Sequence, residues 1–278
     1  MMAALAPLRH ASREFLARWK VAERKSATEA RHMEGVIALF VCGLIVLTGW
    51  LGDAQIAASA RATPEGWQSF FQRVTKLGES GWIFALCTCI VALALLLRHR
   101  GFGARMDAAL GLLAGRAFFI IFVNATAGLL SLGLKSLIGR ARPRLFDVVG
   151  PFHFDLFSIK SAVLSFPSGH SVTAFATATA LAFLAPRAGR WALGLAVLIG
   201  ISRVVTGAHY PSDVIAGMAL GTATCIFARR AFAARAIVFR HADTGIILRG
   251  AGLVGWAMRQ AVFIWRARAS RTGSRSLS

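Results

Sequence analysis

The sequence predicts an all-α membrane protein: a six-helix transmembrane bundle in one domain, with interfacial N- and C-terminal helices. Hydrophobic residues make up 56% of the 278 residues and charged residues only 16%, which is too little polar surface to cover a water-soluble globule of this size. Apolar runs recur along the chain, and the longer ones approach the roughly 20 residues that a membrane-spanning helix needs. The six runs cover residues 35–52, 81–97, 117–134, 171–185, 191–201 and 214–228.

The first run is expected to stay in the protein as a helix. A secretory signal peptide is the alternative, but the basic segment that precedes the run is far longer than a signal peptide carries. Residues 53–80 contain Trp67, Phe70 and Phe71 at helical spacing. This stretch therefore predicts a loop followed by a helix that lies along the membrane surface.

The C-terminal region contains one more apolar stretch, residues 246–265, which Arg249 and Arg259 interrupt. Because an arginine in the middle of a span costs about 2.5 kcal/mol or more, an interfacial helix is preferred to a seventh span. The chain is thus expected to consist of a basic cytoplasmic tail (1–34), a six-span domain (35–228) and a second basic cytoplasmic tail (229–278).

Positive charge dominates the chain, with 32 Lys and Arg against 12 Asp and Glu and a net charge of +20. Most of the basic residues lie in the two tails and in loops between apolar runs, which favours anchoring beside anionic lipid on the cytoplasmic side over nucleic-acid binding. Both termini are therefore expected in the cytoplasm of a bacterium, with the protein in its inner membrane. Lys135, residues 136–166 and residues 203–210 then face the periplasm.

Three polar segments share that predicted outer face, and together they contain two histidines, three cations and a carboxylate. The segments are Lys135 to Arg142-Pro143, Pro167-Ser168-Gly169-His170, and Ser202-Arg203 with His209 and Asp213. Any one of these residues alone is an ordinary anchor, cap or turn residue. As a set they match phosphoryl transfer without a metal, in which cations spread the phosphoryl charge, one histidine attacks and the other protonates the leaving oxygen.

Local spacing predicts how these segments work. Lys135 and Arg142 lie two helical turns apart and point the same way if the third span continues past the membrane. Ser168 is a plausible N-cap of the fourth span, and Gly169 allows an anion close to the backbone. Asp213 is expected to accept a hydrogen bond from one ring nitrogen of His209.

The three segments, in order and spacing, resemble the signature of the type 2 phosphatidic acid phosphatase superfamily. The resemblance implies a six-helix membrane core, a site at the extracytoplasmic helix ends and no cofactor. It further implies that His209 is the nucleophile that forms a phosphohistidine, that Asp213 orients His209, and that His170 is the general acid. The phosphate-binding residues that it implies are Lys135, Arg142, Ser168, Gly169 and Arg203.

Metal binding is not expected elsewhere in the chain. Asp147, His153 and Asp155 include an H-x-D pair, but solvated loop residues or headgroup contacts are the preferred interpretation. The four cysteines lie inside apolar runs without metal-ligand spacing, so they are expected to pack as small apolar side chains and to form no disulfide framework.

The function predicted from these residues is hydrolysis of a phosphomonoester or pyrophosphate on a membrane lipid. The substrate remains open among undecaprenyl pyrophosphate, phosphatidic acid, phosphatidylglycerol phosphate and lipid A phosphates; an Arg- and Ala-rich composition typical of high-GC bacteria keeps the lipid A class in consideration. The alternatives are a lipid phosphotransferase that uses the same phosphohistidine, the vanadate haloperoxidase branch, which is soluble, and a lipid or anion transporter. The oligomeric state is also left open.

Overall fold

The computed structural model describes residues 32–98, 103–242, 245–250, 252–257 and 259–260. The chain divides into two compact parts, residues 1–48 and 49–278. The first part is described from residue 32 onward, as most of the helix His32–Leu51. The predicted N-terminal interfacial helix and the end of the C-terminal tail lie outside the described residues.

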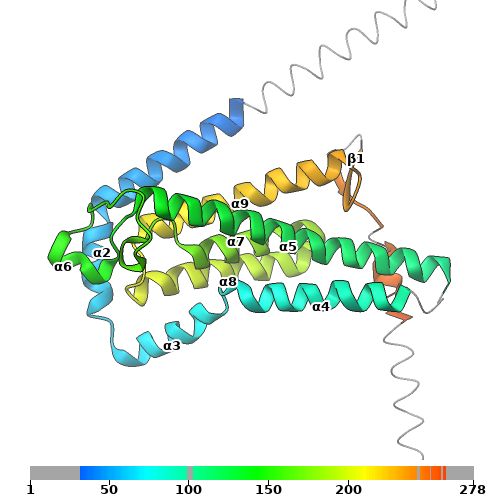
Figure 1. Ribbon diagram of the computed structural model, residues 1–278, viewed down its shortest axis with the longest axis horizontal. Helices are drawn as coiled ribbons and strands as arrows, with labels where there is room; N and C mark the ends of the chain where they lie inside the picture. Colours follow the sequence, from blue (N-terminus) through cyan, green and yellow to red (C-terminus); the bar gives the residue numbers. More distant parts are fainter. Residues whose placement is uncertain (1–31, 99–102, 243–244, 251, 258, 261–278) are drawn as a thin grey trace, which may run out of the picture. The chain divides into compact units, whose positions relative to one another are not determined.

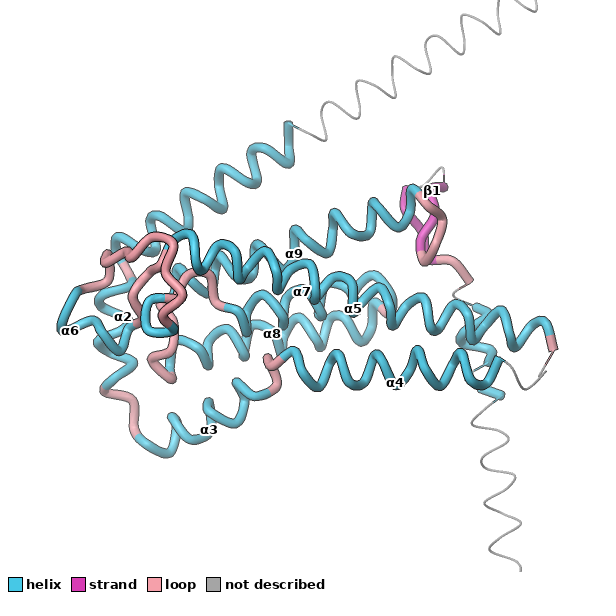
Figure 2. The backbone as a smooth tube through the Cα atoms, viewed as in Figure 1, coloured by secondary structure: helices cyan, strands magenta, loops and turns pink. Residues whose placement is uncertain are grey.

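The second part consists mainly of helices, which run lengthwise beside one another (Figure 1). In chain order its elements are α2 (Asp53–Arg61), α3 (Glu65–Lys76), α4 (Ser80–Arg98), α5 (Ala104–Ile138), η2 (Pro143–Leu145), α6 (Phe146–Val149), η3 (Ser161–Val163), α7 (Gly169–Leu184), α8 (Pro186–Val205), α9 (Pro211–Ala234), β1 (Phe239–Ala242) and β2 (Gly245–Leu248). Figure 2 shows the irregular segment between α5 and α7 at one end of this part and the β1–β2 hairpin toward the other.

Helix α7 lies at the centre, packed against α5, α8 and α9. Small residues bring α7 and α9 into close contact: a Cβ placed on Gly221 would lie 2.4 Å from the Val172 carbonyl oxygen, and one on Gly217 would lie 2.6 Å from that of Ser168. Backbones can approach in this way only where side chains are absent. The close approach of α9 therefore places its N-terminus beside the N-terminus of α7.

Among the described residues, five helical stretches are long and apolar enough to cross a membrane: His32–Leu51, Glu65–Arg98 (which comprises α3 and α4), Ala104–Ile138, Pro186–Val205 and Pro211–Ala234. The shorter apolar helix Gly169–Leu184 has 16 residues, or about 24 Å at 1.5 Å per residue, against a hydrocarbon core of about 30 Å. The protein is thus a mostly helical, multi-pass membrane protein, and a count of six spans stays a prediction.

Three expectations about local structure need correction. Helix α5 starts at Ala104, well before the predicted run 117–134. Residues 53–80 form two helices, so α2 was missed, although α3 was expected from the aromatic spacing. The apolar stretch 246–265 begins as a strand, because Gly245 and Gly250 take positive φ values and residues 245–248 pair antiparallel with β1; the described fold is therefore not purely α-helical.

Candidate active site

Helix α5 delivers Lys135 to the site but does not continue to Arg142. It ends at Ile138, where Gly139 adopts a left-handed conformation with φ +59°. A Cβ on Gly139 would lie 1.6 Å from the carbonyl oxygen of Asp155, so glycine alone fits this close turn. The expectation that one continuous helix aligns Lys135 with Arg142 is therefore wrong.

An extended segment, residues 140–142, brings Arg142 back toward Lys135. Its backbone is hydrogen-bonded on both sides, by Ala141 N–H to the carbonyl of His153 (3.0 Å) and by Arg142 N–H to that of Ala162 (3.0 Å). The Lys135 ammonium donates to the carbonyl of Leu164 at 2.9 Å, and the Arg142 guanidinium reaches the same oxygen at 3.5 Å. Lys135 and Arg142 thus come together because the loop folds back, which the helical spacing in the sequence did not predict.

The second predicted segment forms the start of α7. Ser168 occupies the N-cap position, but its hydroxyl does not cap the helix and instead accepts a hydrogen bond from the Ser171 hydroxyl at 3.0 Å. The Ser168 N–H donates to the backbone carbonyl of Asp213 at 2.9 Å. No side chain caps the first turn of α7, so its backbone N–H groups can bind an anion. Gly169 has no side chain to block the approach to these groups.

The third predicted segment places His209 and Asp213 side by side at the start of α9. The Nδ1 atom of His209 lies 3.6 Å from Oδ2 of Asp213, which is longer than a hydrogen bond. The Ser165 hydroxyl contacts both groups: it donates to the same Oδ2, and its oxygen is 3.4 Å from Nδ1. With Nδ1 facing this pair, Nε2 is the ring nitrogen that is left for a substrate.

Arg203, at the end of α8, is held by α3, because its guanidinium donates to the Thr75 hydroxyl at 2.7 Å. Its Nε atom is buried and has no hydrogen-bond partner within the described part of the chain. An unpaired buried N–H is costly, so a ligand oxygen here would restore the missing bond. Arg203 therefore carries a donor that is unused in the protein alone.

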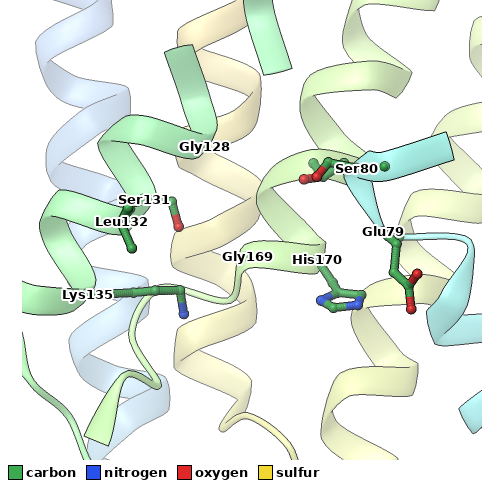
Figure 3. A pocket seen from close by; sticks show the side chains of 11 residues that line it. Glu79, Ser80, Gly128, Ser131, Leu132, Lys135, Gly169 and His170 are labelled. Atoms are coloured by element: carbon green, nitrogen blue, oxygen red, sulfur yellow. The ribbon is translucent and has the colours of Figure 1, made fainter. Parts of the chain in front are cut away.

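The predicted residues converge from separate elements. Lys135 reaches the Ser165 carbonyl at 3.5 Å, and the Ser165 hydroxyl lies 3.4 Å from Nδ1 of His209. The His209 N–H in turn donates to the Arg203 carbonyl at 3.1 Å. Lys135 and His170 also line a cavity of about 470 Å³ between the starts of α4 and α7 and the end of α5. Figure 3 shows His170 beside Glu79, with Lys135 on the other side of Gly169.

Burial governs the ionisation of the loop residues at this site. Burial lowers the pKa of His209 to about 4, although the Asp213 carboxylate beside its ring acts to raise it. Burial also lowers the pKa of Arg142, with the nearby Arg144 acting in the same direction. A buried imidazole with so low a pKa is neutral near pH 7, which is the form that can act as a nucleophile.

Sequence reasoning missed an ion-pair network directly behind Asp213. The guanidinium of Arg140 donates to Oδ1 of Asp213 and to Oδ2 of Asp53, each at 2.7 Å, and also to the Ser212 hydroxyl. Arg140 stands two residues before Arg142, and Asp53 was interpreted only as the end of the first apolar run. A carboxylate directly after a span, on the same predicted face as an extra arginine, was the available signal.

The acidic loop residues have cationic partners. Asp147 pairs with Arg61, and Asp155 lies 3.9 Å from Lys160. Over the described residues, no three His, Cys, Asp or Glu side chains gather as a metal site would require. The four cysteines are free thiols within helices.

The fold and the site together define a class: a multi-pass membrane protein with cations and imidazoles gathered at the ends of its helices. A model of the PAP2 superfamily matches residues 116–237. The chain is 34% identical to a lipid A 1-phosphatase of Rhizobium johnstonii over 230 residues, covering 80% of this chain and 91% of that protein. The chain belongs to the PAP2 superfamily, which confirms the resemblance seen in the three segments.

Other relatives extend this comparison. A lipid A 1-phosphatase of Rhizobium etli is 35% identical over 72% of this chain and 86% of its own length. An undecaprenyl-diphosphatase of Sulfolobus acidocaldarius is 40% identical over 33% of this chain and 44% of its own length. The crystal structure of a transmembrane PAP2-type phosphatidylglycerolphosphate phosphatase from Bacillus subtilis has a TM-score of 0.51 at 26% identity, covering 72% of this chain and 95% of that one.

Proposed function

We propose that the protein hydrolyses a phosphate ester of a membrane lipid through a phosphohistidine on His209, without a metal, at the periplasmic face of a bacterial inner membrane. The chain is a lipid phosphate phosphatase, as its family and its relatives indicate. The observation that supports the mechanism is the convergence of the three segments: Lys135 and Arg142 both reach the Leu164 carbonyl, and Lys135 and His209 both contact Ser165. His170 lines the same cavity as Lys135.

In the first half of the reaction, Nε2 of His209 attacks the phosphorus atom and the bond from phosphorus to the lipid oxygen breaks. His170 gives its proton to that oxygen, so the lipid leaves as an alcohol. Lys135, Arg142 and Arg203 offset the charge on the phosphoryl oxygens, and the N–H groups at the start of α7 assist them. Asp213 and Ser165 face Nδ1 and stabilise the positive charge that the ring acquires.

In the second half, water attacks the phosphorus atom of the phosphohistidine. His170, now without its proton, takes one proton from this water, and the phosphorus–nitrogen bond breaks. Inorganic phosphate leaves, and both histidines regain their starting forms. Phosphotransfer to a lipid hydroxyl would follow the same path with the hydroxyl in place of water, so product analysis separates the two activities.

A lipid A-type phosphomonoester is the substrate that the comparisons favour. The two relatives named lipid A 1-phosphatase match 80% and 72% of this chain, whereas the undecaprenyl-diphosphatase matches 33%. An undecaprenyl pyrophosphate is the second candidate, since the phosphate-binding residues act on the phosphoryl group and not on the alcohol. Anionic lipid at the cytoplasmic face remains the predicted partner of the basic tails.

The experiment is a phosphate-release assay on purified protein in detergent, with chelator present, against lipid A, undecaprenyl pyrophosphate, phosphatidic acid and phosphatidylglycerol phosphate. We expect release from lipid A, and a loss of about a thousandfold or more in His209→Ala because the covalent route disappears. His153→Ala, an exposed loop histidine, is the matched control and should keep full activity. Full activity of a folded His209→Ala protein, or a requirement for added divalent metal, would refute the mechanism.

A further inference from the structure

Behind the candidate nucleophile lies a buried arginine that joins two carboxylates, one in α2 and one in α9. Asp53 and Asp213 are both 0% exposed and Arg140 is 4% exposed. Besides the two carboxylates, the guanidinium donates to the Ser212 hydroxyl at 2.7 Å and to the Pro151 carbonyl at 3.1 and 3.2 Å. It also lies over the ring of Tyr210, 4.3 Å from the ring centre. Arg140 is therefore held on every side.

This arrangement divides the two oxygens of Asp213 between different tasks. Arg140 occupies Oδ1, which leaves Oδ2 for the Ser165 hydroxyl, the Tyr210 N–H at 3.0 Å and the ring of His209. A carboxylate held at one oxygen by a planar fork cannot rotate freely. We propose that Asp53 and Arg140 are positioning residues that hold Asp213 in the orientation needed to align His209, an inference that rests on the proposed phosphohistidine mechanism.

Asp53 adds a second effect, which is electrostatic. One arginine between two carboxylates leaves a net charge of −1 in the group. If Asp53 were neutral, the charge of Arg140 would be directed at Asp213 alone, and Asp213 would stabilise a positive His209 ring less well. The Asp53 side chain also accepts the Ser212 N–H at 3.0 Å, which ties α2 to the start of α9. Asp53 thus acts on His209 through Arg140 and Asp213, without contact with substrate.

A contribution to folding stability does not by itself explain the buried network of Asp53, Arg140 and Asp213. Buried ion pairs lose much of their attraction to the cost of removing both charges from water, and apolar replacements are often at least as stable. Asp53 also lies outside residues 116–237, which carry the family match. The direct contact with the carboxylate beside His209 is what gives the network a role in the reaction.

The test is Asp53→Asn, which preserves shape and removes the charge, with Asp147→Asn as the matched control. Asp147 is an exposed carboxylate that also pairs with an arginine. We expect kcat for phosphate release from lipid A in mixed micelles to fall about ten- to hundredfold in Asp53→Asn. KM should stay within about twofold, because the phosphate-binding cations are untouched, and Asp147→Asn should match the wild type in both constants.

A second measurement separates positioning from general support of the fold. If Asp53 acts through Asp213, then adding Asp53→Asn to Asp213→Asn should lower kcat by less than about twofold, since the route is already broken. The thermal unfolding midpoint in detergent is recorded for each variant. Arg140→Lys, which keeps the charge but cannot reach both carboxylates at once, provides an independent variant with the same expected loss of kcat.

The outcomes distinguish this inference from the mechanism on which it rests. Equal kcat in Asp53→Asn and Asp147→Asn, or a full further loss in the Asp213→Asn background, overturns the positioning role while His209→Ala remains inactive. Failure of both Asp53→Asn and Arg140→Lys to fold also overturns it, because the pair would then serve structure alone. Activity in His209→Ala would instead reject the phosphohistidine mechanism itself.

Discussion

His209 lies in the short connection between α8 and α9, with 3% of its surface exposed. Burial lowers its pKa to about 4, opposed by Asp213 and supported by the charges of Lys135 and Arg203. Its role as candidate nucleophile was predicted from the resemblance of the three segments to the family signature. Its state of ionisation could not be predicted, because burial of the ring depends on how the loop at Ser165 packs against the ends of α8 and α9.

This ionisation predicts how stability changes with pH. The folded-state pKa of about 4 is below the usual value of 6.5, so as pH falls from 6.5 toward 4 the unfolded chain takes up a proton that the folded protein does not. Wild type should therefore lose stability over this range relative to His209→Gln, which has no such proton to bind. The measurement is the unfolding midpoint of both proteins in detergent between pH 7 and 4.5. A constant difference between the two across this range would contradict the prediction.

At the scale of elements, the segments that connect the helices position many of the candidate site residues. Gly139 ends α5 and turns the chain, the extended segment 140–142 carries both arginines, and the turn after α3 packs against His170. The apolar runs were visible in the sequence because hydrophobicity is a local property. The turn at Gly139 depends on a carbonyl from Asp155, which lies far along the loop, and so the end of α5 was predicted wrongly.

The turn between α3 and α4 gives a test of this placement. A Cβ on Gly78 would lie 2.7 Å from Cγ2 of Ile199 and 3.2 Å from two atoms of His170. We expect Gly78→Ala to push His170 from its position and to lower kcat about tenfold, since small displacements of a general acid reduce catalysis strongly. Gly81→Ala is the control, because its Cβ meets nothing within 4 Å although Gly81 lines the same cavity. Equal kcat in the two variants would show that His170 does not depend on this turn.

At the scale of the whole molecule, the distribution of basic residues predicts which side of the membrane each loop occupies. The segment between α5 and α7 carries part of the candidate site and should face the periplasm, whereas the start of α8 carries Arg187 and Arg190 and should face the cytoplasm. The two segments lie at opposite ends of the 16-residue helix α7. The orientation can therefore be read from two positions.

Cysteine labelling tests this orientation. In a variant without the four native cysteines, Val148→Cys should react with a membrane-impermeant maleimide in intact spheroplasts, since Val148 is 80% exposed in α6, between α5 and α7. Arg187→Cys, also at an exposed position, should react only after the membrane is made permeable. Labelling in the reverse order would place the candidate site in the cytoplasm.

The sequence by itself determined the class of protein and predicted a set of candidate site residues, because apolar runs, motif spacing and side-chain chemistry are all local properties of the chain. It could not reveal that Asp53 and Ser212, 159 residues apart, are hydrogen-bonded. Nor could it distinguish Arg140, which binds Asp213, from Arg142, which lies beside Lys135. Those assignments came only from the tertiary structure, because the close packing of α7 and α9 and the turn at Gly139 decide which charges share a buried space, and a buried charge must find its partner wherever the fold places it.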